Sequence, residues 1–424
     1  MEESNVISKK WEIRKLSTVI SITKGKKPRN LEANNTRYLI PYINIEAFEK
    51  GVFTQYTDGI DARTCDVTDI LMVWDGARCG LVGKGVSGAI GSTLAKLDFQ
   101  DFIPSFVFYF LQSHYDTINK NPRGIGIPHV DPNIFWNIQI PLPPLAEQER
   151  IVAKIEALFS QLEAGGAALR RAQAGLKRYK ASLLKAACEG RLVPQDPSDE
   201  PAEVVLRRLG KSPLQDASLP SLPRGWCWVT MSEVADINLR EPFIRNLPDD
   251  LLVTFVPMAA VNAEMGIIVK PEQRPLKEVR KGFTSFLEGD VIFAKITPCM
   301  ENGKAAIVPK LHNGVGFGST EFHVLRPREN VISQWLFYFV RRESFRVDAK
   351  ASFTGTAGQL RVPAKFLASY PFPLPPLAEQ ERIVAELEQR LTVVAQVEAA
   401  IQAALTRSAR LRQAILKRAF RGEL

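Results

Sequence analysis

One thirteen-residue segment, PLPPLAEQERIVA, occurs twice in this chain, at residues 141–153 and again at residues 373–385. The offset is 232 residues, and the same offset aligns Leu184 with Leu416. About 50 residues therefore repeat without an insertion or deletion, which is far more than chance gives. The repeat indicates an internal duplication, so any fold must accommodate two copies of this segment.

The duplication continues upstream as scattered matches. Trp11 corresponds to Trp226, and the triplet Gly-Ser-Thr at residues 91–93 returns at residues 318–320. Between such anchors the two copies differ almost everywhere. Variable and constant segments therefore alternate along the chain. This pattern predicts two heads that share a scaffold and present different surfaces.

Each variable part has the signature of a mixed α+β domain. Residues 105–111 and 334–340 predict short buried helices. Short apolar runs bounded by glycine and proline predict strands at residues 39–45, 70–73, 251–256 and 291–294. We therefore expect two heads of mixed α/β structure.

Each constant segment predicts one long amphipathic helix. Prolines precede it, and glutamates lie in its first turns, near the positive end of the helix dipole. Apolar residues then recur at spacings of three and four, which is the heptad pattern of a coiled coil. Arg390 and Ser408 interrupt this pattern in the second copy. The predicted seam consists of Ile155, Leu158, Leu162, Leu169, Leu176, Leu183, Leu387, Val394, Val397, Ile401, Leu411 and Ile415.

A single helix of about 44 residues, roughly 65 Å long, needs a partner for its apolar stripe. The other copy is the simplest partner, and the order head, helix, head, helix favours an antiparallel pair. We predict an α+β chain in which two mixed α/β heads are separated by two long helices forming an antiparallel coiled coil. The internal duplication gives this chain a pseudo-twofold arrangement.

Five segments follow from these patterns. We predict a linker between the first long helix and the second head because six prolines lie there, with one or two helical turns around residues 202–209. The segments are a first head at 1–144, a first conserved spacer helix at 145–193, the proline-rich linker at 194–223, a second head at 224–376 and a second conserved spacer helix at 377–424.

Cations gather on the second half of each long helix. Residues 170–185 carry six cations and no acid, and residues 407–421 also carry six cations. A solvated face with cations near the negative end of the helix dipole is the simplest interpretation. Contact with DNA phosphates and docking of a partner subunit remain open.

The net charge of +9 and the pI of about 9.2 permit an anionic partner such as DNA. Arginine and lysine side chains in loops can reach phosphates or guanine edges. For any single one of them, a role in solubility alone is the simpler interpretation. The candidate DNA contacts are Lys24, Lys26, Lys27, Arg29, Arg63, Arg78, Lys84, Arg240, Arg245, Lys295 and Lys304.

The sequence contains no recognisable catalytic constellation. Gly83-Lys84 resembles the end of a phosphate loop, but Gly85 stands where serine or threonine is required. The four histidines lack metal-ligand spacing, so we expect no metal-binding residues. Because no catalytic constellation is present, we also expect no catalytic and no cofactor-binding residues. Five scattered cysteines favour free thiols in a reducing cytoplasm. The N-terminus lacks the apolar region of a secretory signal, and no apolar run is long enough to span a membrane.

The repeated PLPPLAEQERIV segment, with the helix endings LLKAACEGRL and ILKRAFRGEL, resembles the specificity (S) subunit of Type I restriction–modification enzymes. GDVIFAKITPCMENGKAAIV at residues 289–308 and GWCWVTMSEV at residues 225–234 also resemble that family's target recognition domains. The first head departs further from the pattern, with TDILMVWDGARCGLVGKG in place of the usual stretch.

This resemblance implies a non-catalytic subunit that recognises a bipartite site in double-stranded DNA. Each head would be a target recognition domain for one half of the site, and the paired helices would fix the gap between the halves. Two methyltransferase (M) subunits with S-adenosylmethionine, and restriction/translocase (R) subunits with ATP and Mg²⁺, would dock on it. No cofactor is expected in this chain.

Three other functions remain open on the residues alone. A stand-alone two-headed DNA-binding protein would need tight binding unaided, which the net charge of +1 over residues 1–144 disfavours. The recognition part of a fused methyltransferase–nuclease would need catalytic motifs. A purely structural coiled-coil scaffold would not explain why the heads differ while the helices stay alike.

Overall fold

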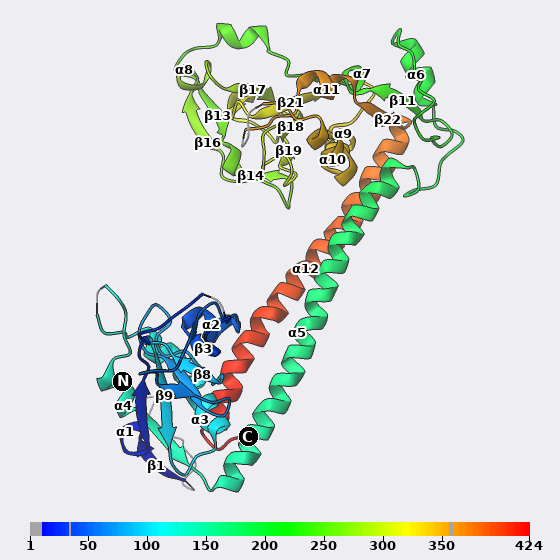
Figure 1. Ribbon diagram of the computed structural model, residues 1–424. Helices are drawn as coiled ribbons and strands as arrows, with labels where there is room; N and C mark the ends of the chain where they lie inside the picture. The colour runs from blue at the N-terminus through cyan, green and yellow to red at the C-terminus, as the bar shows by residue number, and fades with distance from the viewer. Residues whose placement is uncertain (1–10, 34, 125, 356–358) are drawn as a thin grey trace. The chain divides into compact units, whose positions relative to one another are not determined.

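The computed structural model describes residues 11–33, 35–124, 126–355 and 359–424. The chain divides into two compact units. The first contains Met1–Arg171 and Ile401–Leu424, and the second contains Ala172–Ala400. Figure 1 labels many of the elements of each unit. Each long helix contributes to both units, so each unit combines one head with parts of both helices.

The first unit contains two four-stranded sheets and a two-stranded pair. One sheet has the order β2-β9-β6-β7, with bounds Ile20–Lys24, Leu94–Phe99, Ile70–Val73 and Val82–Lys84. The other has the order β4-β3-β8-β5, with bounds Tyr56–Thr57, Ile40–Ile43, Gly88–Ile90 and Thr64–Cys65. Strand β1 (Glu12–Lys15) pairs with β10 (Gln139–Leu142). The helices of this head are α1 (Leu16–Val19), α2 (Ile45–Lys50), α3 (Pro104–Asn119) and α4 (Pro132–Asn137).

The second unit repeats these strand orders. One sheet is β12-β21-β18-β19, at Ala235–Ile237, Phe322–Pro327, Val291–Ala294 and Ala305–Ile307. The other is β16-β13-β20-β17, at Glu272–Pro275, Leu252–Val256, Val315–Gly318 and Thr284–Leu287. In both units the second sheet contains one parallel pair, β3 with β8 and β13 with β20.

The remaining strands of the second unit are β11 (Cys227–Thr230), β22 (Pro371–Leu374), β14 (Val261–Asn262) and β15 (Ile267–Ile268). Its helices are α6 (Ala202–Arg208), α7 (Met231–Val234), α8 (Leu276–Val279), α9 (Ser333–Arg341), α10 (Glu343–Ala351) and α11 (Ala364–Ser369). Short 3₁₀ turns lie at Pro242–Asn246, Met258–Ala260 and His312–Gly314. The predicted mixed α/β character of both heads is confirmed.

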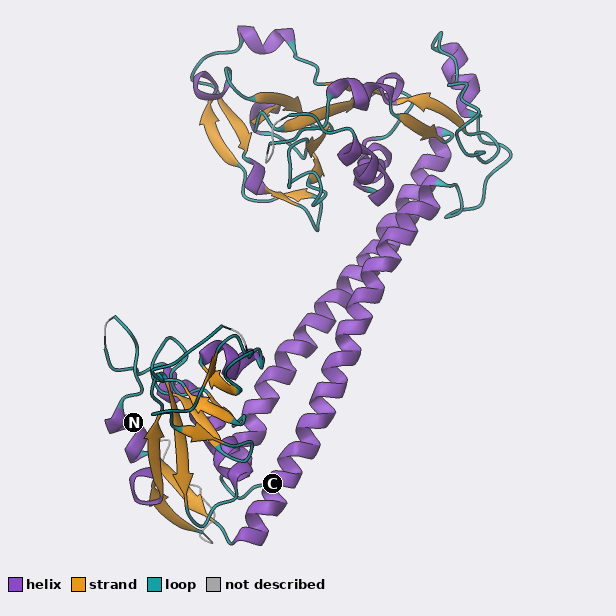
Figure 2. Cartoon of the chain, in the orientation of Figure 1, coloured by secondary structure: helices purple, strands orange, loops and turns teal. Residues whose placement is uncertain are grey.

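The two constant segments form the long helices α5 (Leu145–Cys188) and α12 (Leu377–Ala419), of 44 and 43 residues. Figure 2 shows both as unbroken helices. Each begins directly after the last proline of its PLPP motif, because proline is tolerated at a helix start and not in its interior. Glu147 and Glu379 lie in the first turns, as expected from the dipole.

The end of α12 completes the core of the first head. The ring of Phe420, just after α12, contacts the ring of Phe106 edge-on, with centroids 5.1 Å apart. Leu416 joins the same core as Phe159 of α5. The Arg412 guanidinium lies 4.1 Å from the Phe159 ring and 3.1 Å from Glu163. The core of the first head therefore includes residues of α12, which are far from that head in the sequence (Figure 1).

The end of α5 completes the core of the second head in the same manner. Leu183 and Ala187 are buried in one cluster with Leu387 of α12 and Trp335 of α9. Nearby, Lys180 Nζ lies 2.7 Å from a carboxylate oxygen of Glu398.

Two predicted seam residues require correction. Val397 and Leu411 are 41% and 44% exposed, whereas Ile155, Leu183, Leu387, Val394 and Ile401 are buried. The charged neighbours Glu398 and Arg412 are less exposed than Val397 and Leu411, and each contacts the facing helix within its unit. The aliphatic stem of a long charged side chain can cover apolar surface while its charged end finds a partner. The apolar pattern alone therefore misplaced the seam by one residue at both positions.

Residues 194–223 were predicted as a linker. Within this segment, helix α6 packs against the second head. Ala202 and Leu206 of α6 are buried in the same cluster as Cys227 and Val229 of β11. The matching positions of β1 hold Glu12 and Arg14, which are exposed and form an ion pair.

Candidate nucleic-acid interface

Each head contains a loop junction, and the two junctions are equivalent. In the first head, the end of β6 meets the loop that precedes α4. In the second head, the end of β18 meets the loop that precedes α11. Val130 N donates to the carbonyl of Trp74 at 2.9 Å, and Val362 N donates to the carbonyl of Lys295 at the same distance. Trp74 N in turn donates to Thr93, as Lys295 N does to Glu321. These backbone hydrogen bonds are thus the same in both heads, and the side chains at this junction can be compared directly.

In the first head this junction is centred on the carboxylate of Asp75. Lys24 Nζ lies 2.6 Å from one oxygen, and His129 donates through Nδ1 to the other oxygen at 2.6 Å. Arg63 donates to the backbone carbonyl of Lys24. The side chains of Lys24 and His129 remain 45% and 46% exposed, so their cationic and imidazole groups stay accessible.

In the second head the equivalent junction is centred on Arg361. Its guanidinium donates twice to Glu321, from Nε and Nη2, both at 2.8 Å. This bidentate bond lowers the pKa of Glu321 and raises that of Arg361. Arg361 occupies the position that His129 has in the first head, because both pair with the backbone at the base of their loop. One scaffold therefore presents two different sets of hydrogen-bonding groups.

A buried histidine supports this junction in the second head. His323 lies on β21 and is 3% exposed. Its Nε2 is 2.9 Å from the carbonyl of Val362, so Nε2 carries the hydrogen and Nδ1 accepts from the Asn238 amide at 3.0 Å. Burial lowers the pKa of His323 to about 4. The ring is neutral near pH 7 and holds the loop that carries Arg361.

The predicted contact residues of the first head fall into two groups. Lys24 and Arg63 meet at the Asp75 junction, and Lys26 and Lys27 are exposed just beyond it. The others lie elsewhere on the head: Arg29 is paired with Asp61 at 3.0 Å, Arg78 is paired with Glu49 at 2.5 Å, and Lys84 is exposed at the end of β7.

Of the four predicted contact residues of the second head, Lys295 is the one that lies at the junction. Lys304 is half-buried and donates to the backbone carbonyl of Met258 at 2.8 Å, which ties two loops together. Arg240 and Arg245 are exposed before and within the 3₁₀ turn Pro242–Asn246.

Sequence reasoning missed the residues that centre each junction, namely Asp75, His129, Glu321 and Arg361. A usable signal was present. The 232-residue offset that aligns Val130 with Val362 also places His129 opposite Arg361. A pair of unlike polar residues inside an otherwise aligned segment marks a position where the scaffold is shared and the chemistry differs.

The cations of the long helices are partly accounted for within the units. Lys180 pairs with Glu398, Arg412 with Glu163, and Arg418 lies 3.5 Å from Glu423. Arg170 and Arg171 are exposed. The ion pairs favour the interpretation of these cations as a solvated, self-paired helix face.

Other kinds of site were sought over the described residues. No group of three or more potential ligands there could hold a metal ion. Within that same part of the chain, no helix combines the length and apolar character needed to cross a bilayer. All five cysteines lie in described segments, and all are free.

Comparisons with known proteins all indicate the same family. The profile described as Type I restriction modification DNA specificity domain matches residues 8–168 and 223–407. The specificity subunit of the Type I restriction enzyme EcoAI of Escherichia coli is 38% identical over 243 residues, which are 53% of this chain and 41% of that protein. The alignment thus spans about two fifths of that relative.

Two further similarities extend over most of the chain. The MjaVIII specificity subunit of Methanocaldococcus jannaschii is 25% identical over 400 residues, with 89% of this chain and 85% of that protein covered. A solved chain from work on complex assembly and conformational transition of the type I R-M system has a TM-score of 0.71 at 23% identity, with 99% of each chain covered. This structural likeness concerns the fold alone. Because the profile matches both heads and continues into both long helices, this chain belongs to the family of Type I restriction–modification DNA specificity domains.

Proposed function

We propose that this chain is the DNA specificity subunit of a Type I restriction–modification system. Its two heads, 1–144 and 224–376, would each recognise one half of a bipartite double-stranded site. The observation that carries this proposal is the shared loop junction with different polar groups, His129 and Asp75 in one head and Arg361 and Glu321 in the other. Side chains of these types can donate to or accept from base edges in the major groove.

The two long helices, 145–193 and 377–424, would form one antiparallel coiled coil that fixes the distance between the half-sites. Two contacts support this arrangement. Glu163 pairs with Arg412 and Lys180 pairs with Glu398, so the partner number falls along α12 as the residue number rises along α5. Residues 194–223 would connect the first helix to the second head, and the matched strand orders support a pseudo-twofold duplication.

The chemistry would lie in partner subunits. Two methyltransferase subunits would supply S-adenosylmethionine, and restriction/translocase subunits would use ATP and Mg²⁺. This chain would choose the site and act in the cytoplasm as a non-catalytic recognition subunit. Its five free thiols fit a reducing compartment.

Exchange of one head tests the proposal. Residues 11–144 would be replaced by the corresponding segment of another family member, and the chain would be co-expressed with its M subunits. Mapping of methylated adenines in the host genome should then show one half-site changed and the other retained. Changes in both halves, or in neither, would contradict recognition by separate heads.

A finer version targets the junctions alone. Arg361→Ala should relax or weaken recognition in one half-site, and His129→Ala should do so in the other. Each lost base contact should cost about 1–3 kcal/mol of discrimination. Arg14→Ala, on the exposed face of β1, is the matched control and should leave the methylated sequence unchanged.

A further inference from the structure

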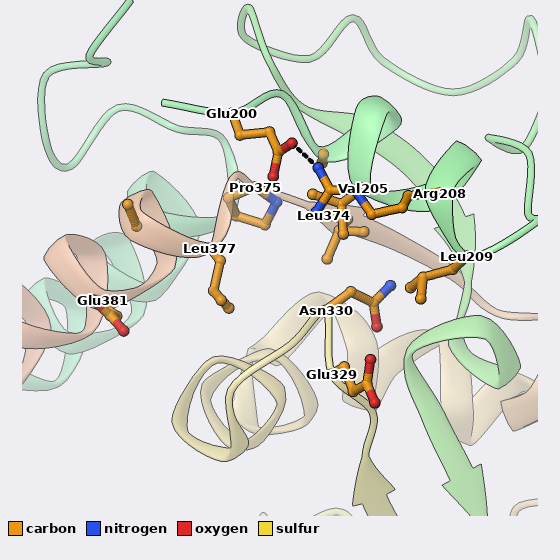
Figure 3. Close-up of a pocket in the computed structure, with 12 residues that line it drawn as sticks. Glu200, Val205, Arg208, Leu209, Glu329, Asn330, Leu374, Pro375, Leu377 and Glu381 are labelled. Atoms are coloured by element: carbon orange, nitrogen blue, oxygen red, sulfur yellow. Dashed lines mark hydrogen bonds and ion pairs between the residues drawn. The ribbon is translucent and has the colours of Figure 1, made fainter. Parts of the chain in front are cut away.

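The second unit contains a cavity of about 540 Å³ next to helix α6. It lies between α6, the turn before α9 and the start of α12. Its volume is within the range of sites that bind small ligands or side chains. Figure 3 shows the lining residues, which are Glu200, Ala202, Val205, Arg208, Leu209, Glu329, Asn330, Leu374, Pro375, Leu377, Ala378 and Glu381.

The side chain of Asn330 has no hydrogen-bond partner among the described residues, although the residue is only 4% exposed. Both its Nδ2 and its Oδ1 are unpaired. The backbone is held in place, because the carbonyl of Asn330 accepts from Gln380 Nε2 at 3.0 Å. An unpaired buried amide is destabilising, so it calls for a physical explanation. A side-chain amide offers one donor and one acceptor face, which complements a peptide group.

The wall around this amide is aliphatic. Leu209 and Leu377 are 39% and 43% exposed, and they flank Asn330 in Figure 3. Leu374, Pro375 and Val205 complete the apolar lining.

The rim of the cavity is acidic. Glu329 and Glu381 are exposed and form no ion pair within the described part of the chain. Glu200 is already paired with Arg208. A cationic group at this rim would therefore meet a carboxylate that is not already paired within the described part of the chain.

We propose that this cavity is a docking site for a short extended peptide of a partner protein, with an aliphatic side chain beside a lysine or arginine. The aliphatic group would lie between Leu209 and Leu377. The peptide group next to it would pair with the Asn330 amide, and the cation would lie against Glu381, while Glu329 adds negative charge to the rim. This inference uses residues of the second unit only and does not depend on the proposed recognition of DNA.

Among the described residues, this site occurs in the second unit. Leu145, Ala146 and Glu149 match Leu377, Ala378 and Glu381 in the repeat. The described part of the first unit has no counterpart of α6, and its β1 carries the exposed pair Glu12 and Arg14 at the positions that α6 covers on β11. The described residues of the two units thus differ at this site.

Fluorescence anisotropy on the full chain tests the proposal. The probe is a labelled hexapeptide, Gly-Leu-Lys-Leu-Lys-Gly, acetylated and amidated at its ends. Two comparison peptides replace its lysines by glutamate or its leucines by serine. Saturable binding of the probe alone is expected, with Asn330→Leu and Glu381→Lys each weakening it about tenfold or more. Glu149→Lys, the same change in the other copy of the repeat, should leave binding unchanged.

Thermal unfolding separates loss of the site from loss of the fold. Asn330→Leu should unfold at the same or a higher temperature, because it removes unpaired polar atoms from a buried position. Glu381 is exposed, so its variant tests the rim even where Asn330→Leu fails to fold. The proposal is overturned if the probe shows no saturable binding at millimolar concentration, if all three peptides bind alike, or if Glu149→Lys weakens binding as much as Glu381→Lys.

Discussion

The side chains of Gln148 and Gln380 make the same three hydrogen bonds, each in its own unit. Gln148 accepts from Ile103 N at 2.9 Å and donates to the carbonyls of Asp101 and Pro143. Gln380 accepts from Ile332 N at 3.1 Å and donates to the carbonyls of Asn330 and Pro375. Both side chains are fully buried. The repeated glutamine of the PLPPLAEQERIVA motif thus joins each long helix to the head that precedes it.

Replacement of either glutamine by leucine should loosen one unit and spare the other. Gln148→Leu leaves one buried N–H and two carbonyls without partners, which should cost about 2–5 kcal/mol in the first unit. Hydrogen–deuterium exchange should then quicken in α3 and not in α9, and Gln380→Leu should give the reverse. The exposed neighbour Glu149→Ala is the control. Equal quickening in both units would contradict this account.

Phe420 should be essential for the first head although it lies near the chain's end. It is 6% exposed and contacts Phe106 and Phe110 edge-on. Phe420→Ala should destabilise the first unit by about 3–5 kcal/mol through lost burial and a new cavity. Thermal unfolding by calorimetry would measure the loss. Phe420→Leu should cost less, and the exposed Arg421→Ala should cost almost nothing. A stable, fully folded Phe420→Ala chain would show that the end of α12 is dispensable.

Only Cys299 should react with iodoacetamide in the native protein. It is partly exposed, whereas the other four cysteines are buried. Burial raises the pKa of Cys65 and Cys188 to about 11 and that of Cys227 to about 12, so their reactive thiolates are scarce at pH 8. Mass spectrometry should find one modified site before unfolding and five in urea, and Cys299→Ser should abolish the native reaction. Native labelling of Cys188 or Cys227 would contradict the packing described for the second head.

Local sequence predicted some of these features well and others poorly. Residues 70–73 and 291–294 form strands β6 and β18 as predicted, because a short apolar run between turns is typical of a buried strand. The Asp75–His129 contact joins residues 54 apart through a loop, and no periodic pattern records it. Val397 and Leu411 were misplaced because Glu398 and Arg412 find ion partners on the facing helix, which an apolar pattern does not register. The packing of α6 likewise depends on Cys227 and Val229, which are distant in sequence.

Acid should weaken the second unit through His323. Its pKa is about 4 in the folded chain and about 6.5 in an unfolded one, so the unfolded chain binds more protons between these values. Stability should therefore fall by about 3 kcal/mol as the pH drops from 6.5 to 4. Lys295 strengthens the pKa shift and Glu321 opposes it. Urea unfolding of His323→Gln should lack this part of the pH dependence, whereas the exposed His312→Gln should retain it. The same acid sensitivity in both variants would assign the effect to other groups.

Lengthening both long helices should lengthen the unread gap of the DNA site. One heptad inserted into each helix, after Ala172 in α5 and after Leu405 in α12, adds about 10 Å at 1.5 Å per residue while preserving the apolar period. At 3.4 Å per base pair, this corresponds to roughly three base pairs. Methylation mapping should show both half-sites unchanged and the gap between them longer. As a control, the same seven residues inserted within the non-helical segment 212–218 should leave the length of the unread gap unchanged. If the longer helices gave the original gap, the helices would not set the distance between the half-sites. That result would contradict this part of the proposed function, whereas recognition by separate heads would not be affected.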